Sequence, residues 1–427
     1  MGKGWLAATA LGLCGLLSVG SHAADRHQGV ATCASSLCHG ATAPLGDYPI
    51  RQDEYFVWQR QDPHAKAHQT LHSAESRKIG AALGINAATD PDCLSCHAEV
   101  ASPALRGPQS HASDGISCEA CHGGAERWLA EHTRHGITLA EKVSLGMTPT
   151  WQRDTRAALC LGCHQGDAEH RITHAMMAAG HPRLVFELDT FSALQPPHYD
   201  RDADYAQRKA AYEPVRDWIA GQAKAAELHL QALADGRLMN GLMPEWMQFD
   251  CSACHHRMDA ARGQPARMPG AAPGAVPFAD GPAQLIALWL AAVAPAEVAG
   301  WREGQRQLHR AQTQGGEAVR RAAQQQLVLL RTRLGAALTQ STPNSTQLRS
   351  LARSLARDAA HANAPLTNEQ RAMALTVVAD SLRQQGAALP AKASQAIESY
   401  YQAVGSVDGF EPRAHALALE AVARALP

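Results

Sequence analysis

The sequence contains few of the large side chains from which a conventional hydrophobic core is built, since aromatic residues make up only 5% of its 427 residues. It also lacks an excess of charge of either sign, because 39 Lys and Arg residues face 40 Asp and Glu residues. A chain without a basic surplus has no general attraction for nucleic acid or for an anionic membrane surface. The composition therefore indicates neither class of partner.

Beyond the first 23 residues, the sequence lacks an apolar run of the roughly 20 residues that a membrane-spanning helix requires. The longest run, Leu285–Ala294, predicts a core helix. Residues 1–23 are different, because Lys3 precedes an apolar stretch and the tripeptide at 21–23 resembles a signal-peptide cleavage site. We expect residues 1–23 to be a signal peptide, with a periplasmic or secreted mature chain that has no membrane span. An uncleaved anchor is the alternative.

Cysteine is absent after residue 254, and ten of the eleven cysteines form five closely spaced pairs. A histidine directly follows the second cysteine of every pair. Four pairs have the spacing C-x-x-C-H, and the first pair has four residues between its cysteines. In chain order the motifs are Cys33, Cys38 and His39; Cys93, Cys96 and His97; Cys118, Cys121 and His122; Cys160, Cys163 and His164; and Cys251, Cys254 and His255. The unpaired Cys14 lies in the expected signal peptide.

This order of residues is that of a c-type haem attachment site. Two thiols bond to the vinyl groups of one haem, and the next residue supplies an imidazole to the iron. Zinc knuckles and redox dithiols also use paired cysteines, but neither requires the following histidine. The sequence therefore predicts five covalently attached haem c groups, with the motif histidines as proximal ligands. For the first motif, a disulfide between Cys33 and Cys38 is the alternative.

The second axial position of each iron is filled by histidine or methionine, or is left open. Sixteen further histidines follow the signal peptide, so the supply exceeds the demand. Local sequence favours histidines that are held at a helix start or between Gly and Pro, or that lie close to a motif. The distal candidates are His64, His132, His174, His181 and, as the fifth choice, His27. His111 is the main competitor, and His198 and His256 are less favoured.

The predicted fold is mostly α, with a haem-binding part followed by a helical bundle. Residues 24–262 form the pentahaem domain, in which short helices and loops wrap around a haem stack that supplies the core. Within it, residues 205–235 predict one long helix that ends at Gly236. Residues 263–281 are a Pro/Gly-rich linker, and residues 282–427 predict a bundle of about six helices.

Two local predictions concern this bundle. Thr367 and Gln370 form a capping-box pattern at a helix start. His309, His361 and His415 are expected to be surface or packing histidines rather than ligands.

Several stretches together resemble the multihaem cytochrome c-554 family, over roughly residues 26–257. They are CASSLCHG, EYFVWQRQDPHAKAH, DGISCEACHGGAERWL and, after CLGCH, MMAAGHPRLVFELDTF. The resemblance implies haems packed edge to edge or in parallel pairs, mostly with two histidine ligands and sometimes with one five-coordinate iron. It supports His64, His132, His174 and His181 as distal ligands and makes His27 more plausible. The fifth site, the C-x4-C-H motif and the bundle depart from the four-haem prototype.

The leading functional hypothesis is electron transfer between a donor and an acceptor protein, because irons with two histidine ligands leave no position for a substrate. The bundle would then dock a partner or a second copy of the chain. The alternative is a reductase that acts on a small nitrogen or sulfur oxyanion at a five-coordinate haem, with Arg183 or His111 polarising the substrate. The absence of a C-x-x-C-K motif argues against it. A haem-rich conductive filament is a third, less favoured hypothesis.

Overall fold

The computed structural model describes most of the chain, and its fold is mostly α-helical, as the sequence predicts. The described residues are 25–46, 50–99, 102–237, 239–240, 243–255, 270–272, 274–357, 365–404 and 412–427. The expected signal peptide, most of the Pro/Gly-rich linker, His256 and His361 lie outside this part of the chain. Among the described helices, none is both long enough and apolar enough to cross a membrane.

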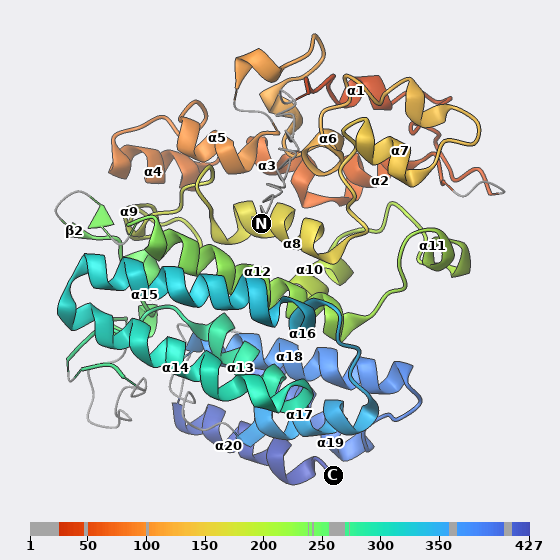
Figure 1. Ribbon diagram of the computed structural model, residues 1–427. Coiled ribbons are helices and arrows are strands. Elements are labelled where there is room, and N and C mark those ends of the chain that lie inside the picture. The colour runs from red at the N-terminus through yellow and green to blue at the C-terminus, as the bar shows by residue number, and fades with distance from the viewer. Residues whose placement is uncertain are drawn as a thin grey trace, which may run out of the picture.

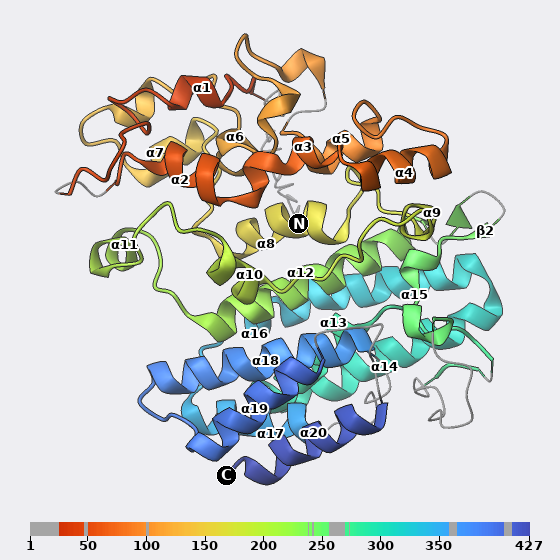
Figure 2. The ribbon, with the colours of Figure 1, turned by 180° about the vertical axis from the view of Figure 1, so that it is seen from behind.

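The first half of the chain forms a layer of short helices and loops, drawn in red to light green in Figures 1 and 2. Its α-helices are α1 (Val30–Cys33), α2 (Glu54–Gln61), α3 (Ala67–Thr70), α4 (Ala74–Leu83), α5 (Pro91–His97), α6 (Cys118–His122), α7 (Leu139–Ser144), α8 (Arg153–Gln165), α9 (His174–Ala178), α10 (Leu188–Leu194) and α11 (Ala203–Arg208). Four single-turn helices complete it: η1 (Pro63–Lys66), η2 (Pro103–Leu105), η3 (Ala112–Asp114) and η4 (Glu131–Thr133).

This layer has almost no hydrophobic core of its own. The two clusters of buried apolar residues that the structure describes begin at Ala157, and residues 25–152 contribute no member to either. Buried apolar side chains such as Val57, Leu71 and Trp128 are scattered through the layer. Short helices are marginally stable without tertiary packing. The layer therefore needs apolar surface from a source other than its own side chains.

The second half of the chain is a helical bundle that lies below this layer in Figure 1. Its helices are α12 (Pro214–Ala234), α13 (Gly281–Val293), α14 (Pro295–Ala311), α15 (Gly316–Leu329), the π-turn η8 (Leu330–Leu334), α16 (Gly335–Thr339), α17 (Ser345–Arg357), α18 (Pro365–Gln384), α19 (Ala391–Ala403) and α20 (Pro412–Ala425). The remaining elements are β1 (Met239–Asn240), β2 (Met243–Pro244), η5 (Trp246–Gln248), η6 (Cys251–Ala253) and η7 (Gln312–Gln314). The strands pair antiparallel. The described part beyond residue 280 thus has more helices than the six expected.

The prediction of one long helix over residues 205–235 is wrong, because two helices occupy this stretch. α11 ends at Arg208, and α12 begins at Pro214, whose ring fixes φ and suits the first turn of a helix. The predicted stop is confirmed, since Gly236 follows the end of α12 with a φ of 79°. Trp218 and Leu233 of α12 are fully buried in the same cluster as the helices after residue 280, so α12 belongs to the bundle core.

The predicted capping box is also wrong, because α18 begins at Pro365 and Thr367 lies within its first turn. The Gln370 side chain instead donates a hydrogen bond of 2.9 Å to the backbone oxygen of Phe186, and so joins the bundle to the first half of the chain. His309 and His415 are buried packing residues, as expected.

Candidate haem centres

Each of the five motif histidines faces one other histidine across a gap of similar width. The distances between ring centroids are 6.3 Å for His39 and His132, 6.5 Å for His97 and His181, 6.3 Å for His122 and His198, 6.0 Å for His164 and His64, and 6.1 Å for His255 and His174. Two imidazoles that bind one metal through bonds of about 2.0–2.1 Å, the zinc–imidazole length, have ring centres roughly 6 Å apart. The residues present therefore fit an iron with a histidine on each face.

Local structure places the thiols beside the motif histidine. In α5, α6 and α8 the two cysteines are three residues apart and the histidine comes four residues after the first, so all three lie on neighbouring positions of one helical face. The first motif instead begins at the end of α1, and the fifth begins at η6. None of the ten described cysteines forms a disulfide. The disulfide alternative for Cys33 and Cys38 thus finds no support.

Hydrogen bonds to Nδ1 orient five of the ten imidazole rings in these pairs. Each accepting group is a carboxylate or a backbone carbonyl, which is the usual outer partner of a metal-bound histidine. The Nδ1 contacts are His39 with Glu54 at 3.1 Å, His64 with Asp62 at 2.8 Å, His97 with the Ala67 carbonyl at 2.9 Å, His132 with the Leu129 carbonyl at 2.5 Å, and His181 with the Pro182 carbonyl at 2.8 Å. These contacts fix the tautomer and leave Nε2 available for a metal.

Burial keeps two of the motif imidazoles neutral, which is the form that binds a metal. It lowers the pKa of His122 to about 3 and that of His164 to about 4. The His164 ring also stacks on Phe186, with 4.8 Å between their centroids. The hydrogen bond to Glu54 acts in the opposite direction and raises the pKa of His39.

The structure differs from the sequence-based choice at one distal position. His27 is bound through Nδ1 to Glu99, at 3.1 Å, and forms no ring contact with another histidine in the part of the chain that the structure describes. The side chain of Glu99 is only 4% exposed, so its contact with the His27 ring is shielded from water. His198 takes the place opposite His122. Its signal in the sequence was Pro196 and Pro197, which restrict the backbone directly before it.

The other four distal candidates, His64, His132, His174 and His181, each face a motif histidine. His111, the main competitor, is exposed at the start of η3. Arg183, a candidate for polarising a substrate, forms an ion pair with Glu369 of α18 at 2.8 Å. Its charge is therefore already engaged by the bundle.

The motifs lie next to one another in an order that differs from their order in the chain. The thiols of Cys33 and Cys118 interact, which lowers the pKa of Cys33 and raises that of Cys118. The thiols of Cys96 and Cys163 interact in the same way. Cys121 of the third motif lies within electrostatic range of Cys160 of the fourth. The sequence of neighbours is therefore first, third, fourth and second motif.

The fifth motif joins this row through α9. His174 begins α9 and faces His255 of the fifth motif, whereas His181, seven residues later, faces His97 of the second. Gly180, with a φ of 111°, turns the chain between them. One short segment thus supplies facing rings to two neighbouring motifs.

A buried carboxyl next to the Phe186–His164 stack gives the protein a pH-dependent stability. Glu187 caps α10 by accepting hydrogen bonds from the backbone nitrogens of Asp189 and Thr190, at 2.9 and 2.8 Å. Burial raises its pKa from 4.5 to about 7. Between these values the folded chain keeps a proton that the unfolded chain has lost, so the free energy of unfolding falls as the pH rises.

We expect Glu187→Gln to remove most of this dependence. A pKa change of one corresponds to about 1.4 kcal/mol, so the part of the stability lost between pH 5 and pH 8 through Glu187 is up to about 3 kcal/mol. Urea unfolding of the wild type and the variant at both pH values measures it, with exposed Glu420→Gln as the control. An unchanged pH dependence in Glu187→Gln would contradict the assignment.

Comparison with known proteins finds that part of the chain is similar to a family. Residues 32–123 match the family model described as "Cytochrome c554 and c-prime", and this match covers the first three motifs. Members of this family carry covalently bound haem c and take part in electron transfer. No curated protein and no solved structure gives a match to the chain.

Proposed function

From the match of residues 32–123 to the cytochrome c554 family model, we propose that this chain is a periplasmic pentahaem c-type cytochrome that transfers electrons between redox partners. Haem c supplies the reversible one-electron chemistry of iron. The protein supplies five attachment motifs, two axial imidazoles for each iron and a scaffold that holds the motifs in a row.

One observation carries this proposal: the number of facing histidines equals the number of motifs. The proposed distal ligands are His132, His181, His198, His64 and His174, for the first to the fifth motif in that order. An iron with two histidines has no open position for a substrate. The pairing therefore favours an electron carrier over a reductase of a small oxyanion.

The row of motifs supports transfer along the protein. Neighbouring thiols join the first motif to the third and the second to the fourth, and Cys121 and Cys160 relate the third to the fourth. α9 adds the fifth motif beside the second. The proposed path thus runs in the order first, third, fourth, second, fifth, with the first and fifth motifs as the ends where donor and acceptor proteins bind. Residues 1–23, as the proposed signal peptide, would direct the chain to the periplasm, where haem c is attached.

Haem counting and low-temperature EPR of the oxidised holoprotein test this proposal. Mass spectrometry is expected to give five haems on one chain that lacks residues 1–23. EPR is expected to give low-spin signals from all five irons. A count below five would contradict the pentahaem assignment. A high-spin signal from one iron in five, shifted by nitrite or nitric oxide, would favour the reductase instead.

A further inference from the structure

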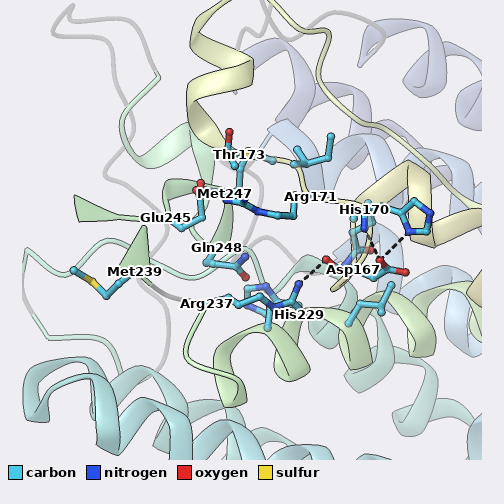
Figure 3. A pocket seen from close by; sticks show the side chains of 15 residues that line it. Asp167, His170, Arg171, Thr173, His229, Arg237, Met239, Glu245, Met247 and Gln248 are labelled. Atoms are coloured by element: carbon cyan, nitrogen blue, oxygen red, sulfur yellow. Dashed lines mark hydrogen bonds and ion pairs between the residues drawn. The ribbon is translucent and has the colours of Figure 1, made fainter. Parts of the chain in front are cut away.

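A polar cavity lies next to the fifth motif, between the loop that follows α8 and the C-terminal end of α12. Its volume is about 160 Å³. Figure 3 shows Arg237 and His229 close together on the α12 side, with Gln248 above them and Asp167 and His170 at one edge. Thr173, directly before His174 of α9, also lines it. The cavity is therefore adjacent to a residue that faces the fifth motif.

Arg237 brings a positive charge to this cavity without a carboxylate to balance it. Its Nη1 donates to the backbone oxygen of Asp167 at 2.6 Å. Its Nε is buried and has no hydrogen-bond partner, and no ion pair joins the guanidinium to an acid among the described residues. A buried polar atom is normally hydrogen-bonded, because burial removes its hydration. The guanidinium thus has a buried donor without a partner and, among the described residues, no direct ion pair.

His229 adds a second free polar atom beside it. Its Nε2 is buried and has no hydrogen-bond partner. The ring packs near Phe278 of the bundle core, with 6.2 Å between centroids, so its position is fixed by apolar contacts rather than by a polar partner. A neutral imidazole that carries its proton on Nε2 can donate to an oxygen in the cavity.

The two acids that line the cavity are engaged elsewhere. Asp167 accepts from the backbone nitrogens of Glu169 and His170, at 2.8 and 2.9 Å, and contacts His170 Nδ1 at 2.8 Å. Glu245 accepts from the backbone nitrogens of His174 and Met247, at 2.9 and 3.2 Å. Both carboxylates therefore stabilise their own loops, and neither supplies the missing anion for Arg237.

We propose that Arg237 and His229 bind the oxygens of an anion in this cavity. The chemistry is that of a carboxylate or a small inorganic oxyanion, which a guanidinium fork binds through two donors. Two sources have this chemistry. One is a propionate of the haem on the fifth motif, and this possibility rests on the proposed function. The other is a free oxyanion such as phosphate, and this possibility is independent of the proposed function.

The test compares the holoprotein with Arg237→Gln, Arg237→Lys and the exposed control Arg321→Gln. Binding of inorganic phosphate is measured by calorimetry, and the five midpoint potentials by spectroelectrochemical titration. If the anion is free, the wild type binds one phosphate and Arg237→Gln weakens it at least tenfold. If the anion is a haem propionate, phosphate does not bind, and Arg237→Gln lowers the potential of one haem because loss of a nearby positive charge stabilises ferric iron.

The lysine variant keeps the charge and loses the fork, so it is expected to give the same change to a smaller extent. It also serves if Arg237→Gln does not fold with its haems. The proposal is overturned if phosphate does not bind and both Arg237 variants keep the five wild-type potentials. A wild-type haem count below five would contradict the proposed function separately, and the phosphate measurement would still apply.

Discussion

Replacing His198 with alanine is expected to convert one haem in five from low-spin to high-spin iron. His198 faces His122 at 6.3 Å, and removal of its ring leaves the iron of the third motif with one axial ligand. EPR and optical spectra of the oxidised holoprotein measure the change. Water is the small ligand expected to enter the position that the His198 ring leaves, and it gives a weaker ligand field than imidazole.

Two histidines provide matched controls for this prediction. His27→Ala removes a ring that is bound to Glu99, and His111→Ala removes an exposed ring, so both variants should retain five low-spin irons. The opposite pattern, with high-spin iron in His27→Ala and none in His198→Ala, would restore the distal ligand that the sequence favoured. It would also require a different arrangement of residues 25–29 from the one described.

The chain without haem is expected to keep its bundle folded and to lose the structure of residues 25–152. Residues 25–152 contribute nothing to either hydrophobic cluster, whereas α12 to α20 share one large core. Burial of apolar surface is the main source of folding free energy. A haem would supply apolar surface to the layer, and the bundle already has its own.

Hydrogen–deuterium exchange of a chain without residues 1–23, made in a cytoplasm that cannot attach haem, measures this difference. Amides of residues 25–152 should exchange at rates close to those of an unfolded chain, and amides of α13 and α18 should remain protected. The holoprotein is the control, with protection in both halves. Equal protection of residues 25–152 in the two samples would show that side-chain contacts alone stabilise the layer.

The sequence was most informative where chemistry fixes spacing. The C-x-x-C-H motifs specify the thiols and the imidazole within one helical turn, so no tertiary information is needed to propose them. The facing histidine of each motif imidazole lies 76 to 100 residues away in the chain, as with His64 and His164. Such a contact depends on how the layer folds, and local sequence signals only restrict the choice.

His27 shows this limit clearly. Its position six residues before Cys33 suggested a local role, but the buried Glu99, 72 residues away, holds its ring. The bundle was easier to predict, because apolar residues at helical spacing reflect its core directly. The break between α11 and α12 was missed even though Pro214 marked it, since the alanine-rich pattern continued on both sides.

The segment from His174 to His181 has a mechanical consequence. Because it supplies facing rings to the second and fifth motifs, a displacement of this segment moves both rings together. A shift of this segment would therefore change the His181–His97 and the His174–His255 distances together. A single substitution in this segment, such as at Gly180, would accordingly disturb two centres at once, and double mutants across it should show non-additive effects.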